Sequence, residues 1–293
     1  MNDTSLCALA ILVSRNPVVR VSHIQQILGG LLGIVTLSYF VFKRRKMPRL
    51  LNGSTKVLIW WMIAFVLIHN TFLCAVNIWQ EILFFTYSEG CDLLILTWHC
   101  LLLRIPTVTS AIGMSAVNML LLIDQLCSIF LRHYYPKDKA PFVISACLML
   151  FVVGMVIVIF RNEDFWGYKP HCVGGSPQNT NILALIHASL LCSHILCTLG
   201  FVLILRHFFF LLKVNKHNFV VDEKLKIRMD IASVRFMMAG TVSSFIFIGA
   251  HLSANFLFRQ LFGSNNLLAK TSWMNGFYGE IQIKLKIVLR KRL

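Results

Sequence analysis

Long apolar runs separated by short polar segments constrain this chain more strongly than any other feature of its sequence. A helix that crosses a lipid bilayer needs about 20 mostly apolar residues. Hydrophobic residues make up 57% of the 293 residues and charged residues only 14%, whereas soluble domains carry about 25% charge. We therefore predict an all-α membrane protein whose six clear spans are 24–42, 57–79, 98–131, 141–160, 182–212 and 236–258.

Basic residues are distributed unevenly among the segments that connect these runs. Short cytoplasmic loops of membrane proteins carry an excess of Lys and Arg. Few of the 28 Lys and Arg residues fall in segments 1–21, 80–104, 161–180 and 259–270, and most fall in segments 43–56, 132–139, 206–235 and 284–292. We therefore expect an extracellular N-terminus and a cytoplasmic C-terminus. Because this topology accounts for the net charge of +16, we expect the lipid bilayer and not nucleic acid as a partner.

A seventh span at about 266–288 is much weaker than the other six. The stretch between Lys270 and Glu280 is too short to cross a bilayer without charges, and Lys284 follows soon after. With only six spans, however, the basic tail 284–292 would lie on the side that is otherwise poor in Lys and Arg. The sequence thus favours a seven-transmembrane helix bundle in which 1–293 is a single domain with an atypical last span. The alternative is a tail that lies along the membrane surface.

Polar residues recur on one face of the third run. A polar group in hydrocarbon is costly, so this face should point into the bundle. The face predicts a ligand pocket near Arg104 and Thr107, although Arg104 also fits a residue at the membrane boundary. Simple hydrogen bonding between helices is the alternative for its deeper part. The residues of the face are Arg104, Thr107, Ser115, Asn118 and Gln125.

Three histidines in the later runs are further pocket candidates, or residues that hydrogen-bond within the bundle. His187 and His194 lie seven residues apart in the fifth run, and His251 lies in the sixth. Seven residues of helix span about 10 Å, too far for two ligands of one metal ion. We therefore expect no metal and no cofactor. No acid, base and nucleophile converge by spacing, so we do not expect an enzyme.

Short motifs around the third run resemble those of one receptor group. These motifs are Cys91-Asp92-Leu93-Leu94, Cys100, Arg104-Ile105-Pro106 and Ile123-Asp124-Gln125. A second similarity lies at Val221-Asp222-Glu223-Lys224 and continues through Arg228 into the sixth span. Together with the seven spans, they resemble the nematode chemoreceptors of serpentine class alpha and its class ab relatives. The resemblance covers about residues 20–260.

This resemblance implies a G-protein-coupled receptor in the plasma membrane of sensory neurons. Such a receptor binds a small chemical ligand in the outer half of the bundle and signals to a heterotrimeric G protein. The resemblance assigns the G-protein side to Asp124, Gln125, Arg132, Lys224 and Arg228. In the family pattern an Arg follows the acidic residue, and here Gln125 stands in its place.

Two other functions stay open at this point. Gln125 and the weak last span suggest a relative of the receptors that does not signal. A transporter or channel would use Arg104 and Asp124 to line a pathway, but internal repeats, which are frequent in transporters, are not evident in the sequence.

Cysteines and one sequon mark the expected extracellular side. Serpentine receptors resembling this chain join the start of the third span to the second extracellular loop, which here contains Cys172. The distance from Asp124-Gln125 favours Cys100 as its partner, and position at the outer boundary favours Cys91. Asn2 opens the sequence Asn-Asp-Thr and is a candidate glycosylation site.

Overall fold

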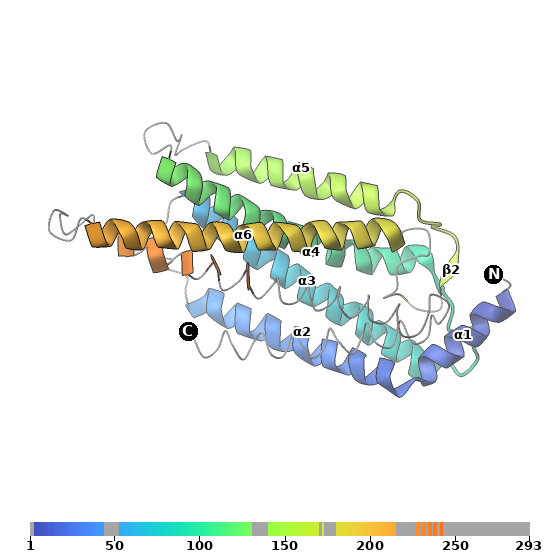
Figure 1. The fold of residues 1–293 in the computed structure, drawn as a ribbon. Helices are drawn as coiled ribbons and strands as arrows, with labels where there is room; N and C mark the ends of the chain where they lie inside the picture. The colour runs from blue at the N-terminus through green and yellow to red at the C-terminus, as the bar shows by residue number, and fades with distance from the viewer. Residues whose placement is uncertain are drawn as a thin grey trace, which may run out of the picture.

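The described part of the chain is a bundle of long helices. The computed structural model describes residues 3–43, 53–130, 140–169, 172 and 180–214, and from the following segment residues 227–228, 230–232, 234–235, 237–238 and 241–242. Figure 1 shows the arrangement. In chain order the elements are α1 (Asp3–Arg15), α2 (Pro17–Lys43), α3 (Gly53–Thr86), β1 (Ile95–Leu96), α4 (Thr97–Phe130), α5 (Ala140–Phe160), β2 (Tyr168–Lys169) and α6 (Thr180–Val214).

Five of these helices are long and apolar enough to cross a membrane, and they coincide with or contain the first five predicted spans. The described residues of the predicted sixth span, up to Val242, are helical. The predicted span at 266–288 lies outside the described residues. The five candidate spans are Val19–Tyr39, Thr55–Thr86, Thr97–Cys127, Phe142–Phe160 and Ala188–Val214.

The second span is longer than the sequence suggested. The predicted second span ends at residue 79, before the charge of Glu81, but α3 continues to Thr86 and Glu81 lies buried within it. The helix can continue because His23 of α2 contacts the Glu81 carboxylate at 2.7 Å. A carboxylate with a partner on the neighbouring helix is tolerated where an isolated one is not.

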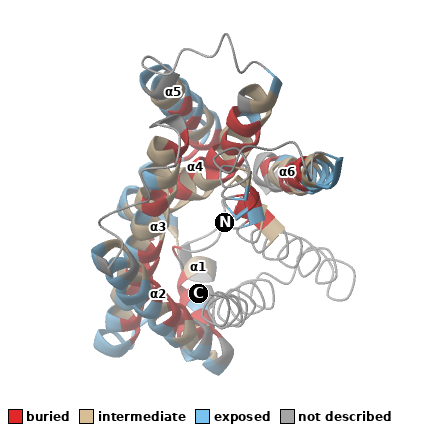
Figure 2. Cartoon of the chain, turned by 90° about the vertical axis from the view of Figure 1, so that its left-hand side faces the viewer, coloured by how far each residue is buried: buried red, intermediate tan, exposed pale blue. Residues whose placement is uncertain are grey.

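Helix α4 is the central element of the described bundle. It contacts α3, α5 and α6, while α2 packs on the far side of α3. Buried residues line the faces that the helices turn towards one another, and exposed residues lie on the outside (Figure 2). On the outer face these include large apolar residues such as Phe142 and Leu150 of α5, as expected for a surface in contact with lipid.

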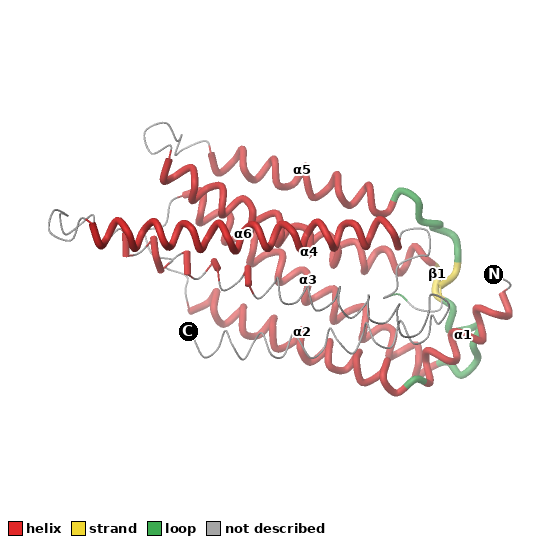
Figure 3. Tube along the Cα trace, viewed as in Figure 1, coloured by secondary structure: helices red, strands yellow, loops and turns green. Residues whose placement is uncertain are grey.

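The two ends of the bundle differ. One end carries α1, the loop 87–94 and the connection 161–169 with its short strand (Figure 3). We call it the disulfide end, because both disulfides of the described residues lie there. At the opposite end α2, α4 and α6 finish and the Lys- and Arg-rich segments begin; we call it the basic end.

Close packing of α3 on α4 depends on a glycine. A Cβ atom added at Gly113 of α4 would lie 2.5 Å from Cζ of Phe65. The Phe65 ring is itself buried and stacks on Trp61 at 5.6 Å between ring centroids, so it has little room to move. Gly113 is therefore a contact point that lets the two helices approach.

Replacing this glycine should loosen the bundle. Overpacking of this kind costs about 1–3 kcal/mol, so we expect Gly113→Ala to lower the melting temperature of the purified protein in detergent. Gly154→Ala is the matched control, because a Cβ there would meet no atom within 4 Å and the helix gains from the change. Equal melting temperatures for the two variants would show that α3 and α4 do not depend on this contact.

Candidate functional site

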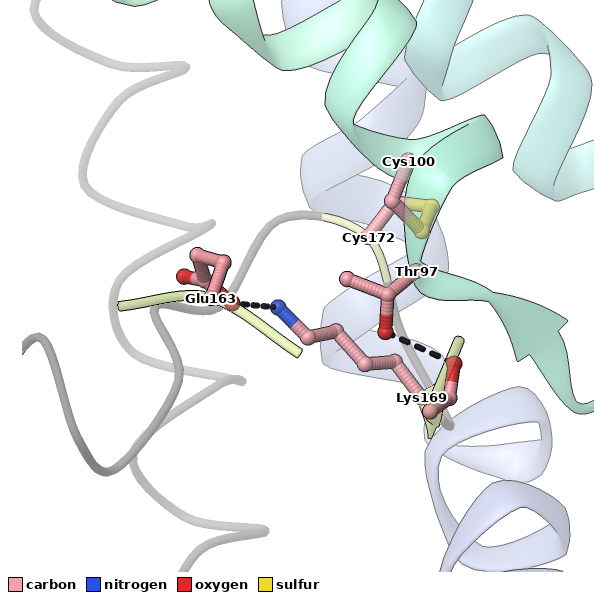
Figure 4. The surroundings of a disulfide bond; sticks show 6 residues. Thr97, Cys100, Glu163, Lys169 and Cys172 are labelled. Carbon is pink, nitrogen blue, oxygen red and sulfur yellow. Dashed lines mark hydrogen bonds and ion pairs between the residues drawn. A yellow bond between two sulfur atoms is a disulfide. The ribbon is translucent and has the colours of Figure 1, made fainter. Parts of the chain in front are cut away.

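A disulfide fastens the connection after α5 to the start of α4. Cys100 and Cys172 are bonded, with their Cα atoms 5.1 Å apart (Figure 4). Of the two partners that the sequence left open for Cys172, the structure joins Cys100. Arg104 and Thr107 follow Cys100 by four and seven residues, about 6 and 10 Å further along the helix. The bridge therefore holds the connection next to the predicted ligand residues of α4.

Strand pairing and an ion pair hold the same connection in place. β1 and β2 pair antiparallel, with Ile95 opposite Lys169. Both the backbone N–H and the hydroxyl of Thr97 donate to the carbonyl of Gly167, at 2.9 and 2.8 Å. The Lys169 ammonium lies 2.9 Å from the Glu163 carboxylate (Figure 4). The connection thus forms a fixed structure over the disulfide end.

A second disulfide, which the sequence analysis missed, joins Cys7 to Cys91. The two Cα atoms are 4.5 Å apart across 84 residues of sequence, and the bond holds α1 on the loop between α3 and α4. The backbones come close here, since a Cβ at Gly90 would meet the carbonyl of Cys7. Because Cys172 is bonded to Cys100, Cys91 has no predicted partner on the same side of the membrane. An unpaired cysteine there was the sequence feature that could have indicated a second disulfide.

Near the disulfide end α4 is tied to α3. Nδ1 of His69 lies 3.2 Å from the carbonyl of Thr107 and 3.2 Å from the Ser110 hydroxyl. The Thr107 hydroxyl donates to the carbonyl of Leu103 within its own helix, at 3.0 Å. Arg104 is half-buried on this stretch. Of the predicted ligand residues, Arg104 and Thr107 therefore lie close together.

Deeper in the bundle the α4 face is tied to α6. The Ser115 hydroxyl and Nε2 of His194 are 3.0 Å apart, and both side chains are buried. One turn further on, the thiol of Cys197 lies 3.0 Å from the sulfur of Met119. His194 thus meets α4 two turns below Thr107, about 12 Å along the axis. The side chain of His187 and the whole of His251 lie outside the described residues.

Two further contacts of α4 lie towards the basic end. The Thr241 hydroxyl lies 3.5 Å from Oδ1 of Asn118, which connects α4 to the helical residues of the predicted sixth span. The Thr55 hydroxyl donates to the Asp124 carboxylate at 2.6 Å, and both residues are buried. Gln125 is also buried beside them. The first turns of α3 and the last turns of α4 are therefore joined by a buried hydrogen bond.

The other predicted coupling residues are placed less completely. Arg228 is helical and exposed. Arg132, Lys224 and the sequon residue Asn2 lie outside the described residues. No group of three or more His, Cys, Asp or Glu side chains in the described part of the chain could hold a metal ion.

These contacts form a continuous set along one helix. From the disulfide end to the basic end, side chains of α4 bond to α3, then to α6, then to the predicted sixth span and again to α3. A movement of α6 or of the sixth span relative to α4 must break or exchange one of these bonds. The arrangement therefore suits a switch between two helix packings.

Two comparisons with known proteins bear on this bundle. The family model described as serpentine type 7TM GPCR chemoreceptor Sra matches residues 3–274. The chain is also 25% identical over 144 residues to serpentine receptor class alpha-13 from Caenorhabditis elegans. That alignment covers 47% of this chain and 43% of the relative, so the matched region spans less than half of the relative's length.

The contact between α4 and α6 should contribute to stability. Ser115→Ala leaves both ring nitrogens of the buried His194 without a partner among the described residues. A buried group that loses its hydrogen bond costs about 1–3 kcal/mol, so we expect a lower melting temperature of the purified protein. Ser189→Ala is the control, because Ser189 is exposed and, among the described residues, bonds only the carbonyl of Ile186 in its own helix. Equal melting temperatures for Ser115→Ala and Ser189→Ala would show that the contact does not contribute to stability.

Proposed function

Because the chain belongs to the Sra family of serpentine seven-transmembrane chemoreceptors, we propose that it is a G-protein-coupled receptor for a small chemical ligand. The ligand binds in the half of the bundle nearest the disulfide end, between α4 and α6 and next to Arg104, Thr107 and His194. His187 and His251 belong to the same proposal by their places in the sequence. The signal passes to a heterotrimeric G protein at the basic end.

The observation that carries this proposal is the set of hydrogen bonds along α4. A ligand that contacts α4 and α6 at the disulfide end acts on the Ser115–His194 pair directly. If the ligand binds one helix packing better than the other, it shifts the population towards that packing. The contacts of Asn118 and Asp124 then change at the basic end, where the predicted coupling residues Gln125, Arg132, Lys224 and Arg228 lie in the sequence.

Charge and cysteine chemistry support the same orientation of the bundle. Disulfides persist in oxidising surroundings, and two of them lie at one end. Lys and Arg accumulate on the cytoplasmic side, and they gather at the other end. We therefore propose a plasma membrane protein whose N-terminus and disulfide end face outwards. Its family of chemoreceptors suggests a sensory neuron as the cell.

Epitope tags on both termini test this orientation. In cells that express the full chain, we expect an antibody to reach an N-terminal tag without permeabilisation and a C-terminal tag only after it. The tagged N-terminus also reports surface delivery for the variants below. A C-terminal tag that is accessible on intact cells would contradict a seven-span receptor.

Ligand screening with a G-protein activation readout tests the signalling claim. Wild type and Gln125→Arg, matched for surface level with the N-terminal tag, are exposed to the same panel of small molecules. We expect at least one compound to activate a G protein, with a larger response from Gln125→Arg because it restores the family residue beside Asp124. If neither form ever activates a G protein, the signalling claim fails. Ligand binding without activation would instead favour a receptor relative that does not signal, as Gln125 suggests.

A further inference from the structure

A second set of buried polar side chains lies between α2 and α3, near the disulfide end and away from the α4–α6 contact. Nδ1 of His23 lies 2.7 Å from the Glu81 carboxylate, and Nδ2 of Asn77 donates to Oε1 of Gln26 at 3.0 Å. Gln80 follows Asn77 by three residues, and its side chain is 0% exposed. None of these five residues takes part in the proposed function of the hydrogen bonds along α4.

Three polar atoms of this set have no hydrogen-bond partner among the described residues. They are Nε2 and Oε1 of Gln80 and Oδ1 of Asn77. Exchanging the O and N of the Gln80 amide changes nothing, since both atoms are unpartnered. Asn77 is fixed, because its Nδ2 donates both to Gln26 and to the carbonyl of Leu73 at 2.7 Å. Buried polar groups are nearly always satisfied, so three together call for an explanation.

The Gln80 side chain points into the bundle and not into lipid. With about 100° of rotation per residue, Gln80 stands about 60° from Asn77 and about 40° from Val76 around the α3 axis. Asn77 faces α2, and Val76 packs with Cys100 and Cys172 at the start of α4. Gln80 therefore lies between the face towards α2 and the face towards α4. The exposed Ile78 lies on roughly the opposite side of the helix.

The free atoms define what chemistry would satisfy them. The Gln80 amide offers an N–H donor and a carbonyl acceptor side by side, and Asn77 adds a second acceptor. The Glu81 carboxylate of the set already has His23 as its partner at 2.7 Å. An anionic ligand would stand near this carboxylate, and a cationic one would compete with His23 for it. A neutral molecule with a donor and an acceptor on neighbouring atoms fits without such a conflict.

We propose that Gln80 and Asn77 form a ligand subsite that binds a small neutral molecule of the primary amide or urea class. The molecule accepts a hydrogen bond from the Gln80 amide and donates to its carbonyl and to Oδ1 of Asn77. This inference deepens the proposed function, on which its biological meaning rests, by adding a second contact region for the ligand and naming the ligand's chemical class.

Thermal unfolding of the purified full chain in lipid nanodiscs tests the subsite without any G protein. Benzamide and acetophenone are the probes, because they share a shape and a carbonyl but only benzamide carries N–H donors. For wild type we expect benzamide to raise the melting temperature more than acetophenone does at the same concentration. Equal shifts with the two probes overturn the proposal, and this comparison needs no variant.

Gln80→Met removes the amide at similar size and provides the second measurement. If the Gln80 amide has no partner in the protein without ligand, the substitution removes an unsatisfied buried group. We then expect the melting temperature of Gln80→Met without probe to be about 2–6 °C higher than that of wild type. The preference for benzamide over acetophenone disappears in this variant. A fall in melting temperature would mean that a structural partner, such as a bound water, satisfies Gln80, and this overturns the proposal.

Gln25→Met is the matched control on the neighbouring helix. Gln25 is half-buried on α2 and takes no part in the bonds between His23, Gln26, Asn77 and Glu81. The same substitution there should keep the preference for benzamide. Loss of the preference in both variants would contradict a subsite at Gln80. Because the melting temperature reports binding without any G protein, a failure here leaves the G-protein result untouched, and the reverse also holds.

Discussion

The polar face of α4 is the constraint on which the rest of the bundle depends. In the hydrocarbon core no water is available, so a polar side chain must find its partner on another helix. Ser110, Ser115 and Asp124 each do so, with His69, His194 and Thr55. Around the α4 axis Ser115 stands about 140° from Ser110 and about 180° from Asp124, since Ser110 and Asp124 meet α3 while Ser115 meets α6, so turning α4 in either direction would break at least one of these bonds. The position of α3 and α6 around α4 therefore follows from hydrogen bonding as much as from apolar packing.

Disulfide bonds hold the structure at the disulfide end. Water is available there, so polar side chains do not need partners on other helices. Cys100–Cys172 holds the connection after α5 over α4, and Cys7–Cys91 holds α1 on the loop after α3. The two bonds join segments that are distant in sequence and restrain the loops. At the basic end no disulfide is present among the described residues, and the buried contact there is the hydrogen bond from Thr55 to Asp124. A rigid end and an end held by exchangeable bonds suit a protein that senses on one side and rearranges on the other.

The sequence predicted the spans and the polar face because both depend on periodicity alone. Apolar length gave the first five spans, and spacings of three and four placed Ser115 and Asn118 on one face of α4. Spacing does not say which helix lies opposite, so the pairing of Ser115 with His194 could not be derived. The predicted second span stops before Glu81, because a charge ends an apolar run when its partner is unknown. That partner, His23, lies 58 residues away on another helix.

The buried polar residues differ in whether their polar atoms have hydrogen-bond partners, and this difference separates two roles. A buried hydrogen bond adds a modest net stability, whereas an unpaired buried group costs stability. Stability alone would therefore favour an apolar residue in place of Gln80, like the neighbouring Val76 and Leu73, which are buried without polar atoms in their side chains. The pairs of α4 resist movement, whereas the Gln80 amide, which has no partner among the described residues, would gain a hydrogen bond from the ligand proposed here. In a receptor this difference is what allows binding at one place to offset the loss of bonds at another.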